Sequence, residues 1–271
     1  MLWQRALIAF TLGPLALYLV YLGGWFYFVP IVLILLLAAY EYSQMMGEIG
    51  LTVSYWLLAP AVLLQLISAQ LPELPLFGPA LLVSLLAIMA YALWLYERRK
   101  SETAPLDWMA LIGGVVLFGW VGGHFLRLRG VETFAWQWTI LALASTWAAD
   151  SGAYLVGKFL AGKVLGRHQL SPRLSPNKTV EGFFGGVVLG TIITLVFAAL
   201  LQLPWTIALV LALLTSMISP LGDLGISLLK REAHIKDSGA VFGVHGGALD
   251  RIDSVLWSVT MAYYLVLFVG R

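Results

Sequence analysis

The sequence predicts an all-α, polytopic membrane protein. Hydrophobic residues make up 61% of the 271 positions, whereas soluble globular domains are nearer half apolar. Charged residues are only 11% of the chain and gather in short stretches, so long apolar segments remain between them. A bilayer core of about 30 Å needs roughly 20 apolar residues per helix. Nine segments meet this need, near residues 6–22, 26–42, 53–70, 78–95, 108–125, 136–156, 182–202, 205–222 and 252–269.

The chain divides into a plain N-terminal half and a polar C-terminal half. Residues 1–105 are expected to form a transmembrane scaffold of about four helices, since they carry few charges and many leucines and aromatics. Arg5 precedes the first segment as in a signal peptide, but no small-residue cleavage site follows, so we expect this segment to be retained. Residues 106–271 carry most of the polar residues and two long loops, and are expected to be the catalytic transmembrane region.

Basic residues indicate which way the chain crosses the membrane. With the N-terminus inside, thirteen of the 16 lysines and arginines lie on the inner side: Arg5, Arg98, Arg99, Lys100, Lys158, Lys163, Arg167, Arg173, Lys178, Lys230, Arg231, Lys236 and Arg251. Arg127, Arg129 and Arg271 remain outside. Because cytoplasmic loops carry excess positive charge, both long loops are expected to face the cytoplasm. The net charge of +2 is too small to indicate a nucleic-acid partner.

A polar stripe continues from segment 205–222. Asp223, Ser227, Lys230 and His234 recur at helical spacing and therefore predict one polar helix face. A carboxylate at the membrane edge is costly unless it is needed, which favours a functional role for Asp223. An amphipathic surface helix with a solvated polar face would give the same pattern.

The stretch after this helix is rich in glycine. Residues 236–247 read KDSGAVFGVHGG, which suits a loop that wraps phosphate but is also typical of flexible loops. Asp250 and Asp253 follow on the first turn of the last helix, and with Asp223 they would offer the oxygen ligands that Mg²⁺ prefers beside substrate phosphates. Helix capping, charge stabilisation at the helix N-terminus or pairing with Arg251 would also explain these two carboxylates.

A third candidate is Asp150, inside segment 136–156. A carboxylate within a membrane span is a functional candidate by default, although a buried pair with a lysine is the alternative. The loop after this segment reads SPRLSPNKTVEG and carries Arg173 and Lys178, which suit a lipid phosphate. The alternative role for Ser175 or Asn177 in this loop is to cap the helix that begins near Glu181.

Several common chemistries are excluded. The sequence has no cysteine, and therefore no disulfide, thiolate metal ligand or cysteine nucleophile. It has no zinc-type His/Cys spacing, no GxSxG motif and no GxxxxGK[ST] motif. Phosphate would have to be held by metal, lysine and loop amides. His245, next to two glycines, is either an exposed loop residue or a phosphate ligand.

The stretch from Ser227 to Asp253, SLLKREAHIKDSGAVFGVHGGALDRID, resembles the diagnostic pattern of the phosphatidate cytidylyltransferase (CDP-diacylglycerol synthase) family. The segments TWxxDSxAY from Thr146 and SPxKTxEG from Ser175 are similar to that family as well. The resemblance covers Ser145 to the C-terminus, and the first half only in hydropathy and length. Ala248 departs from the pattern, because a larger aliphatic residue is usual there.

The resemblance implies a reaction of CTP with phosphatidic acid to give CDP-diacylglycerol and pyrophosphate. It implies an Mg²⁺-dependent, multi-pass homodimer in the inner membrane of a bacterium, with a second cation as an option and with Asp223 and Asp250 as metal ligands. We assign the catalytic residues as Asp150, Lys230, Arg231, Lys236, Asp237, His245 and Asp253. The assigned substrate-binding residues are Arg173, Ser175, Lys178, Glu181, Ser227, Gly246, Gly247 and Arg251.

Within these sets, basic residues are divided between the two substrates. We expect Arg173 and Lys178 to bind the lipid phosphate. The lysines and the arginine of the catalytic set are expected to bind the phosphates of CTP: Lys230, Arg231 and Lys236.

Three other functions compete with this one. Another membrane-embedded phosphotransferase with a nucleotide-activated donor is the first, but a CDP-alcohol phosphotransferase should carry a DGxxAR…GxxxDxxxD pattern that this chain lacks. A transporter using Asp150 and Asp223 is the second, although transporters often carry polar, broken helices in both halves. A lipid-binding scaffold without catalysis is the third, and an activity assay separates it from an enzyme.

The charge distribution predicts a membrane topology. Reporter fusions after residues 100, 165 and 240 should report the cytoplasm, and a fusion after residue 130 the outside, because the basic loops stay inside. Reporters at 165 and 240 on opposite sides would contradict a site built from both loops.

Overall fold

The chain is helical almost throughout, as the all-α prediction requires. The computed structural model describes residues 13–241, 243 and 246–269. Its helices are α2 Gly24–Glu48, α3 Tyr55–Gln70, α4 Phe77–Glu97, α5 Ala104–Gly114, the π-helix η1 Val115–Val121, α6 Gly122–Arg129, α7 Ala135–Phe159, α8 Val180–Leu200, α9 Trp205–Glu232 and α10 Leu249–Val269. The first predicted segment is described only in part, as a short helix over Gly13–Leu22.

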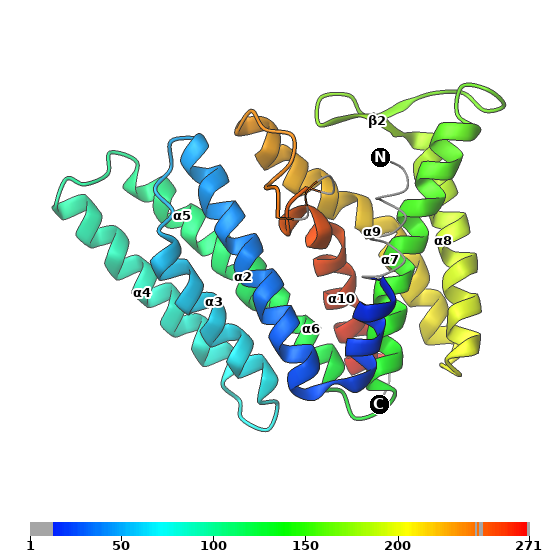
Figure 1. Ribbon diagram of the computed structural model, residues 1–271, viewed down its shortest axis with the longest axis horizontal. Helices are drawn as coiled ribbons and strands as arrows, with labels where there is room; N and C mark the ends of the chain where they lie inside the picture. The colour runs from blue at the N-terminus through cyan, green and yellow to red at the C-terminus, as the bar shows by residue number, and fades with distance from the viewer. Residues whose placement is uncertain (1–12, 242, 244–245, 270–271) are drawn as a thin grey trace. The chain divides into compact units, whose positions relative to one another are not determined.

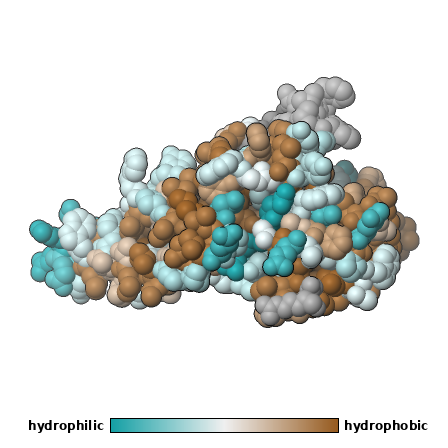
Figure 2. Space-filling view, turned by 90° about the horizontal axis from the view of Figure 1, so that it is seen from below, coloured by the Kyte–Doolittle hydropathy of each residue, from teal (hydrophilic) through white to brown (hydrophobic). Residues whose placement is uncertain are grey.

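The helices are those of a multi-pass membrane protein. Within the described residues, six helical stretches are long and apolar enough to cross a membrane: α2, α4, the run α5–η1–α6, α8, α9 and α10. α3 and α7 coincide with predicted segments but are not among the six, so nine spans are not confirmed. Large apolar side chains are exposed on these helices, and they cover much of the face shown in Figure 2. Such a surface suits lipid rather than water.

The structure forms two compact units, and each is described by itself. The first unit comprises Met1–Gly130 and Leu229–Arg251. In Figure 1, α2, α3 and α4 lie side by side, and α3 also packs against η1 and α6. Fully buried side chains from these helices form its core, among them Leu35, Leu58, Leu66, Leu111 and Phe118. The segment after α9 therefore folds with the N-terminal half, although the sequence places it in the catalytic region.

The second unit comprises Val131–Leu228 and Ile252–Arg271. Its main feature is the packing of α7 against α8, which lie side by side along their lengths in Figure 1. α8 turns a face of small buried residues, Gly182, Gly186 and Gly190, toward α7. A Cβ at Gly186 would stand 2.8 Å from the carbonyl oxygen of Ala149. Close backbone approach of this kind is the usual basis of helix association in membranes.

A short antiparallel hairpin precedes α8 and was not predicted. Strand β1, Gln169–Ser171, pairs with β2, Ser175–Thr179. The predicted helix cap at Ser175 or Asn177 is wrong, because both residues lie in the extended strand β2. Thr179 caps α8 instead, and its hydroxyl oxygen accepts a hydrogen bond of 3.0 Å from the backbone N–H of Gly182. The hairpin thus leads directly into α8.

The close packing of α7 and α8 predicts a sharp difference between two positions on α8. Gly186→Leu should destabilise the protein by about 1–3 kcal/mol, because the new side chain has no space against Ala149 and Ala153. Val188→Leu, at an exposed position of the same helix, is the matched control and should be nearly neutral. Thermal unfolding in detergent measures both, and equal melting temperatures for the two variants would contradict the packing.

Candidate functional site

A large cavity lies in the second unit. It has a volume of about 570 Å³ and is formed by the C-terminal part of α7, the hairpin, the first turn of α8 and the middle of α9. Its lining residues include charged, amide and aromatic side chains: Asp150, Tyr154, Lys158, Arg167, Asn177, Lys178, Phe183 and Asp223. The cavity is large enough for a phosphate-bearing headgroup or part of a nucleotide.

Two carboxylates face this cavity, and each has a partner. Asp223 on α9 forms an ion pair with Lys178 of β2, with 2.5 Å between Oδ2 and Nζ. Asp150 on α7 accepts a hydrogen bond of 2.9 Å from the hydroxyl of Ser219. The hydrogen-bond partner of Asp150 is therefore a hydroxyl group, and not the lysine that the sequence had offered as an alternative partner. Side chains from three distant segments thus meet at one wall.

Basic side chains make the cavity suitable for phosphate. Lys178 is joined by Lys158 and Arg167, which the sequence analysis left unassigned. The ammonium of Lys158 donates a hydrogen bond of 2.6 Å to the Tyr154 hydroxyl. Arg173 is exposed on the hairpin turn and does not line the cavity. Three cations, from α7, from β2 and from the loop before β1, line this cavity and can bind one polyanionic ligand.

A second polar cluster lies in the first unit, around Asp250. The Oδ1 atom of Asp250 accepts a hydrogen bond of 2.6 Å from the ammonium of Lys230, and both side chains are largely buried. The Oδ2 atom accepts three hydrogen bonds: from the N–H of Ser238 at 2.8 Å, from its hydroxyl at 3.0 Å and from the N–H of Gly247 at 3.1 Å. The glycine-rich segment thus wraps around a carboxylate.

Glu41 belongs to this cluster and was missed by the sequence analysis. It lies on α2 and is 4% exposed. Its carboxylate accepts hydrogen bonds from the N–H groups of Ala248 and Leu249, both at 2.9 Å, and from the Ser238 hydroxyl at 2.8 Å. The sequence did contain a signal that could have identified Glu41. It lies within the predicted span 26–42, and a carboxylate within a membrane span is a functional candidate.

The predicted polar stripe on α9 is confirmed as far as Lys230. Asp223 and Ser227 are joined by a hydrogen bond of 3.2 Å from the serine hydroxyl to the aspartate. The helix ends at Glu232, so His234, which has a positive φ of 56°, does not belong to the stripe. A helix end with a left-handed residue shortly after it turns the chain away from the helix axis.

The other assigned residues lie outside these clusters or have structural partners. Glu181 accepts hydrogen bonds from the backbone and ring of His168 and so ties the hairpin to α8. Asp253 is buried and accepts a hydrogen bond of 2.6 Å from the N–H of Ser254. Four further residues are exposed: Arg231, Lys236, Asp237 and Arg251. His245 lies outside the described residues.

The carboxylates have the chemistry of magnesium ligands. In the part of the chain that the structure describes, three or more histidines or acidic residues do not gather at one point. Asp223 forms an ion pair with Lys178, and Asp250 forms one with Lys230. The two aspartates belong to different units. A carboxylate that a flexible ammonium group neutralises can exchange this partner for a cation, so both residues fit the role of hard oxygen ligands.

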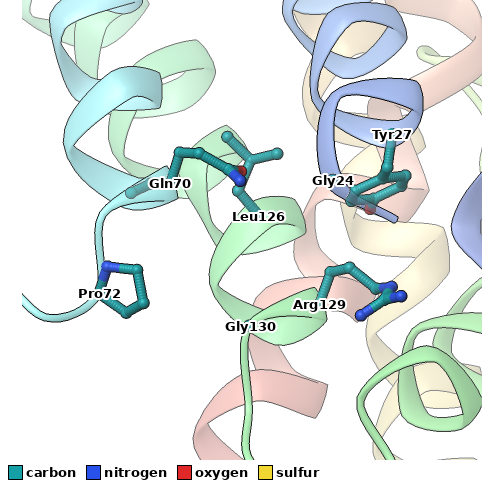
Figure 3. Close-up of a pocket in the computed structure, with 8 residues that line it drawn as sticks. Gly24, Tyr27, Gln70, Pro72, Leu126, Arg129 and Gly130 are labelled. Atoms are coloured by element: carbon teal, nitrogen blue, oxygen red, sulfur yellow. The ribbon is translucent and has the colours of Figure 1, made fainter. Parts of the chain in front are cut away.

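A smaller cavity of about 210 Å³ lies at the N-terminal end of α2 (Figure 3). Its charged side chain, Arg129, donates hydrogen bonds to the carbonyl oxygens of Val20 and Tyr21, at 2.8 and 3.2 Å. These bonds hold the turn before α2. Glu41 lies 17 residues beyond Gly24 on α2, about 25 Å along the helix, so this cavity is remote from the Asp250 cluster.

The chain is similar to known proteins over nearly its whole length. The model of the cytidylyltransferase family matches residues 3–269. A phosphatidate cytidylyltransferase of Synechocystis sp. is 35% identical over 97% of this chain and 96% of its own length. Proteins of the same name are 31% identical in Brucella suis, over 97% of this chain and 92% of the relative, and 36% identical in Bacillus subtilis, over 67% of each.

Proposed function

The chain belongs to the cytidylyltransferase family, and on that premise we propose that it transfers the cytidylyl group of CTP to phosphatidic acid, giving CDP-diacylglycerol and pyrophosphate. The observation that carries the proposal is the similarity to phosphatidate cytidylyltransferases over 97% of the chain, which includes both polar clusters. A cavity with three basic side chains, on helices with an apolar exposed surface, supports a lipid phosphate as one substrate.

The reaction asks little covalent chemistry of the protein. A phosphate oxygen of phosphatidic acid attacks the α-phosphorus of CTP, and the bond from that phosphorus to the bridging oxygen of the β-phosphate breaks. Pyrophosphate leaves with the electron pair. Catalysis then depends on bringing two anionic substrates together and on neutralising charge. The basic side chains that line the cavity, Lys158, Arg167 and Lys178, support the first task.

The two lysine–carboxylate pairs have a part in this proposal. Lys178 neutralises Asp223, and Lys230 neutralises Asp250. Phosphate oxygens are alternative partners for both lysines, whose long stems let the ammonium groups turn toward a ligand. Mg²⁺ held by the Asp223 and Asp250 carboxylates would neutralise charge on the phosphates of CTP. A second cation stays an option.

The cellular setting is part of the same proposal. The inner membrane of a bacterium is supported by the relatives, which come from bacteria, and by the six apolar helical stretches of the chain. A cytoplasmic orientation of the site is supported by the uneven distribution of lysine and arginine. A homodimer in the bilayer remains a prediction from the resemblance.

The decisive test is an assay with purified protein. CTP labelled at the α-phosphate, phosphatidic acid and Mg²⁺ should yield a labelled lipid together with pyrophosphate in equal amounts. CTP labelled at the γ-phosphate should leave the lipid unlabelled and place the label in pyrophosphate. A lipid that stays unlabelled in the first experiment would contradict the proposed reaction.

Removing the charge of either carboxylate tests the metal ligands. Asp223→Asn and Asp250→Asn should each lower turnover by roughly 10²-fold, as expected for the loss of one major electrostatic group, and should change its dependence on Mg²⁺ concentration. Melting temperature in detergent is the folding control. Asp223→Asn is the cleaner variant, since this side chain is one-third exposed whereas Asp250 is largely buried. Near-normal turnover with unchanged Mg²⁺ dependence in both would exclude the assignment.

The cavity predicts which basic residue of the hairpin matters. Lys178→Met should raise the KM for phosphatidic acid by about tenfold, as for the loss of a hydrogen bond to a charged group, and the KM for CTP by less. Arg173→Met, assigned the same role from the sequence, should have a smaller effect because Arg173 is exposed and does not line the cavity. Steady-state kinetics with each substrate varied in turn measures the difference. Equal increases of both KM values in Lys178→Met would argue against a lipid-phosphate role.

A further inference from the structure

We propose that Glu41, on the N-terminal helix α2, is a positioning residue of the active site that holds Ser238 and residues 247–249, at the two ends of the glycine-rich stretch, in place for nucleotide binding. The inference rests on the proposed function and deepens it. It concerns a residue outside the polar C-terminal half.

The first observation is the burial of the Glu41 side chain. A carboxylate withdrawn from water is strongly destabilising unless hydrogen-bond donors replace the lost solvent. Three donors do so here: the N–H of Ala248 on Oε1, and the N–H of Leu249 with the hydroxyl of Ser238 on Oε2. Ser238 and Ala248 lie between α9 and α10, and Leu249 is the first residue of α10. The burial of Glu41 is therefore tolerated only while these residues keep their conformation.

The second observation is that Glu41 and Asp250 share a donor. The Ser238 hydroxyl lies 2.8 Å from Oε2 of Glu41 and 3.0 Å from Oδ2 of Asp250. Asp250 in turn binds the ammonium of Lys230. One hydroxyl thus links a carboxylate of α2 to the lysine–carboxylate pair that the proposed function uses. Because a hydroxyl has a single hydrogen, Ser238 shares it between the two carboxylates, and a displacement of Glu41 would alter the hydrogen bond to Asp250 as well.

The third observation is the absence of free space around the Glu41 carboxylate. A Cβ on Gly247 would collide with Oε2 of Glu41 and with the Ser238 hydroxyl. The backbone therefore approaches the carboxylate so closely that only glycine fits at this position. Such contact is what a rigid loop requires, and rigid support is what holds catalytic groups in a productive geometry.

Glu41 also acts on the start of α10. The N–H groups of Ala248 and Leu249 stand at its first turn, where backbone donors have no partner within the helix. A carboxylate from another helix satisfies two of them, as a capping side chain would. Since Asp250 lies in that first turn, fixing the start of α10 also fixes the position of Asp250.

Glu41→Gln is the sharpest test. Glutamine keeps the shape but has one acceptor oxygen, and its NH₂ group would face a backbone N–H, that of Ala248 or that of Leu249. We expect the KM for CTP to rise by about tenfold, the KM for phosphatidic acid to change less than twofold, and the amides of residues 238–250 to exchange hydrogen faster. Steady-state kinetics and hydrogen exchange on the full-length protein in detergent measure these effects.

Glu48→Gln is the matched control. Glu48 lies on the same helix, two turns further on, and is exposed, so its substitution should leave kinetics and exchange unchanged. Wild-type exchange over 238–250 together with an unchanged KM for CTP in Glu41→Gln would overturn the proposal. An equal rise of both KM values with unchanged exchange would overturn it too, because that result indicates general damage.

A second variant covers the case in which Glu41→Gln does not fold. Ser238→Ala removes one donor and leaves Glu41 both backbone N–H groups, so a smaller rise in the KM for CTP, in the same direction, is expected. An unchanged KM in this variant would then overturn the proposal. Hydrogen exchange needs no turnover, so it decides whether Glu41 holds the segment even if the wild-type protein makes no CDP-diacylglycerol.

Discussion

Carboxylates removed from water impose the strongest constraint on this structure. Each one must receive hydrogen bonds or a counter-ion, and for Asp107 and Glu41 some of the donors come from segments far away in the sequence. Asp107, which is fully buried at the start of α5, accepts hydrogen bonds from the backbone of Thr52 and from the hydroxyls of Ser101 and Thr103. Asp107 thereby fixes both the loop before α3 and the loop before α5. Glu41 and Asp250 do the same for the glycine-rich segment.

The same constraint connects stability with function. A lysine that neutralises a carboxylate is also a group that can bind phosphate, and Lys178 and Lys230 both stand in this position. Without substrates, such pairs lower the energetic cost of keeping charges at the membrane. When an anionic substrate arrives, the lysines have a second set of acceptors. The lysines that stabilise these buried or membrane-edge charges are therefore the ones that the proposed reaction would use.

The helices could be predicted well, whereas the hairpin and the helix cap could not. Apolar runs of about twenty residues are a strong signal, and every segment within the described residues coincides with a helix. β1 and β2 are only three and five residues long and have no apolar alternation, so local pattern does not reveal them. Thr179 caps α8 because strand β2 extends to it, so that Ser175 and Asn177, the two residues considered from the sequence, lie within the strand.

The sequence by itself determined the class of fold, the polar stripe from Asp223 to Lys230 and the candidate carboxylates of the C-terminal half, because periodicity and the cost of charge in an apolar chain are local properties. Only the tertiary structure decided which side chains meet. It paired Lys178 with Asp223 and Lys230 with Asp250, and left Arg173 outside the cavity. It also brought Glu41 to a segment some 200 residues later, within 2.9 Å of two backbone N–H groups. Hydrogen bonds act over about 3 Å, and the spacing of residues along a chain carries no information about such distances until the helices have packed.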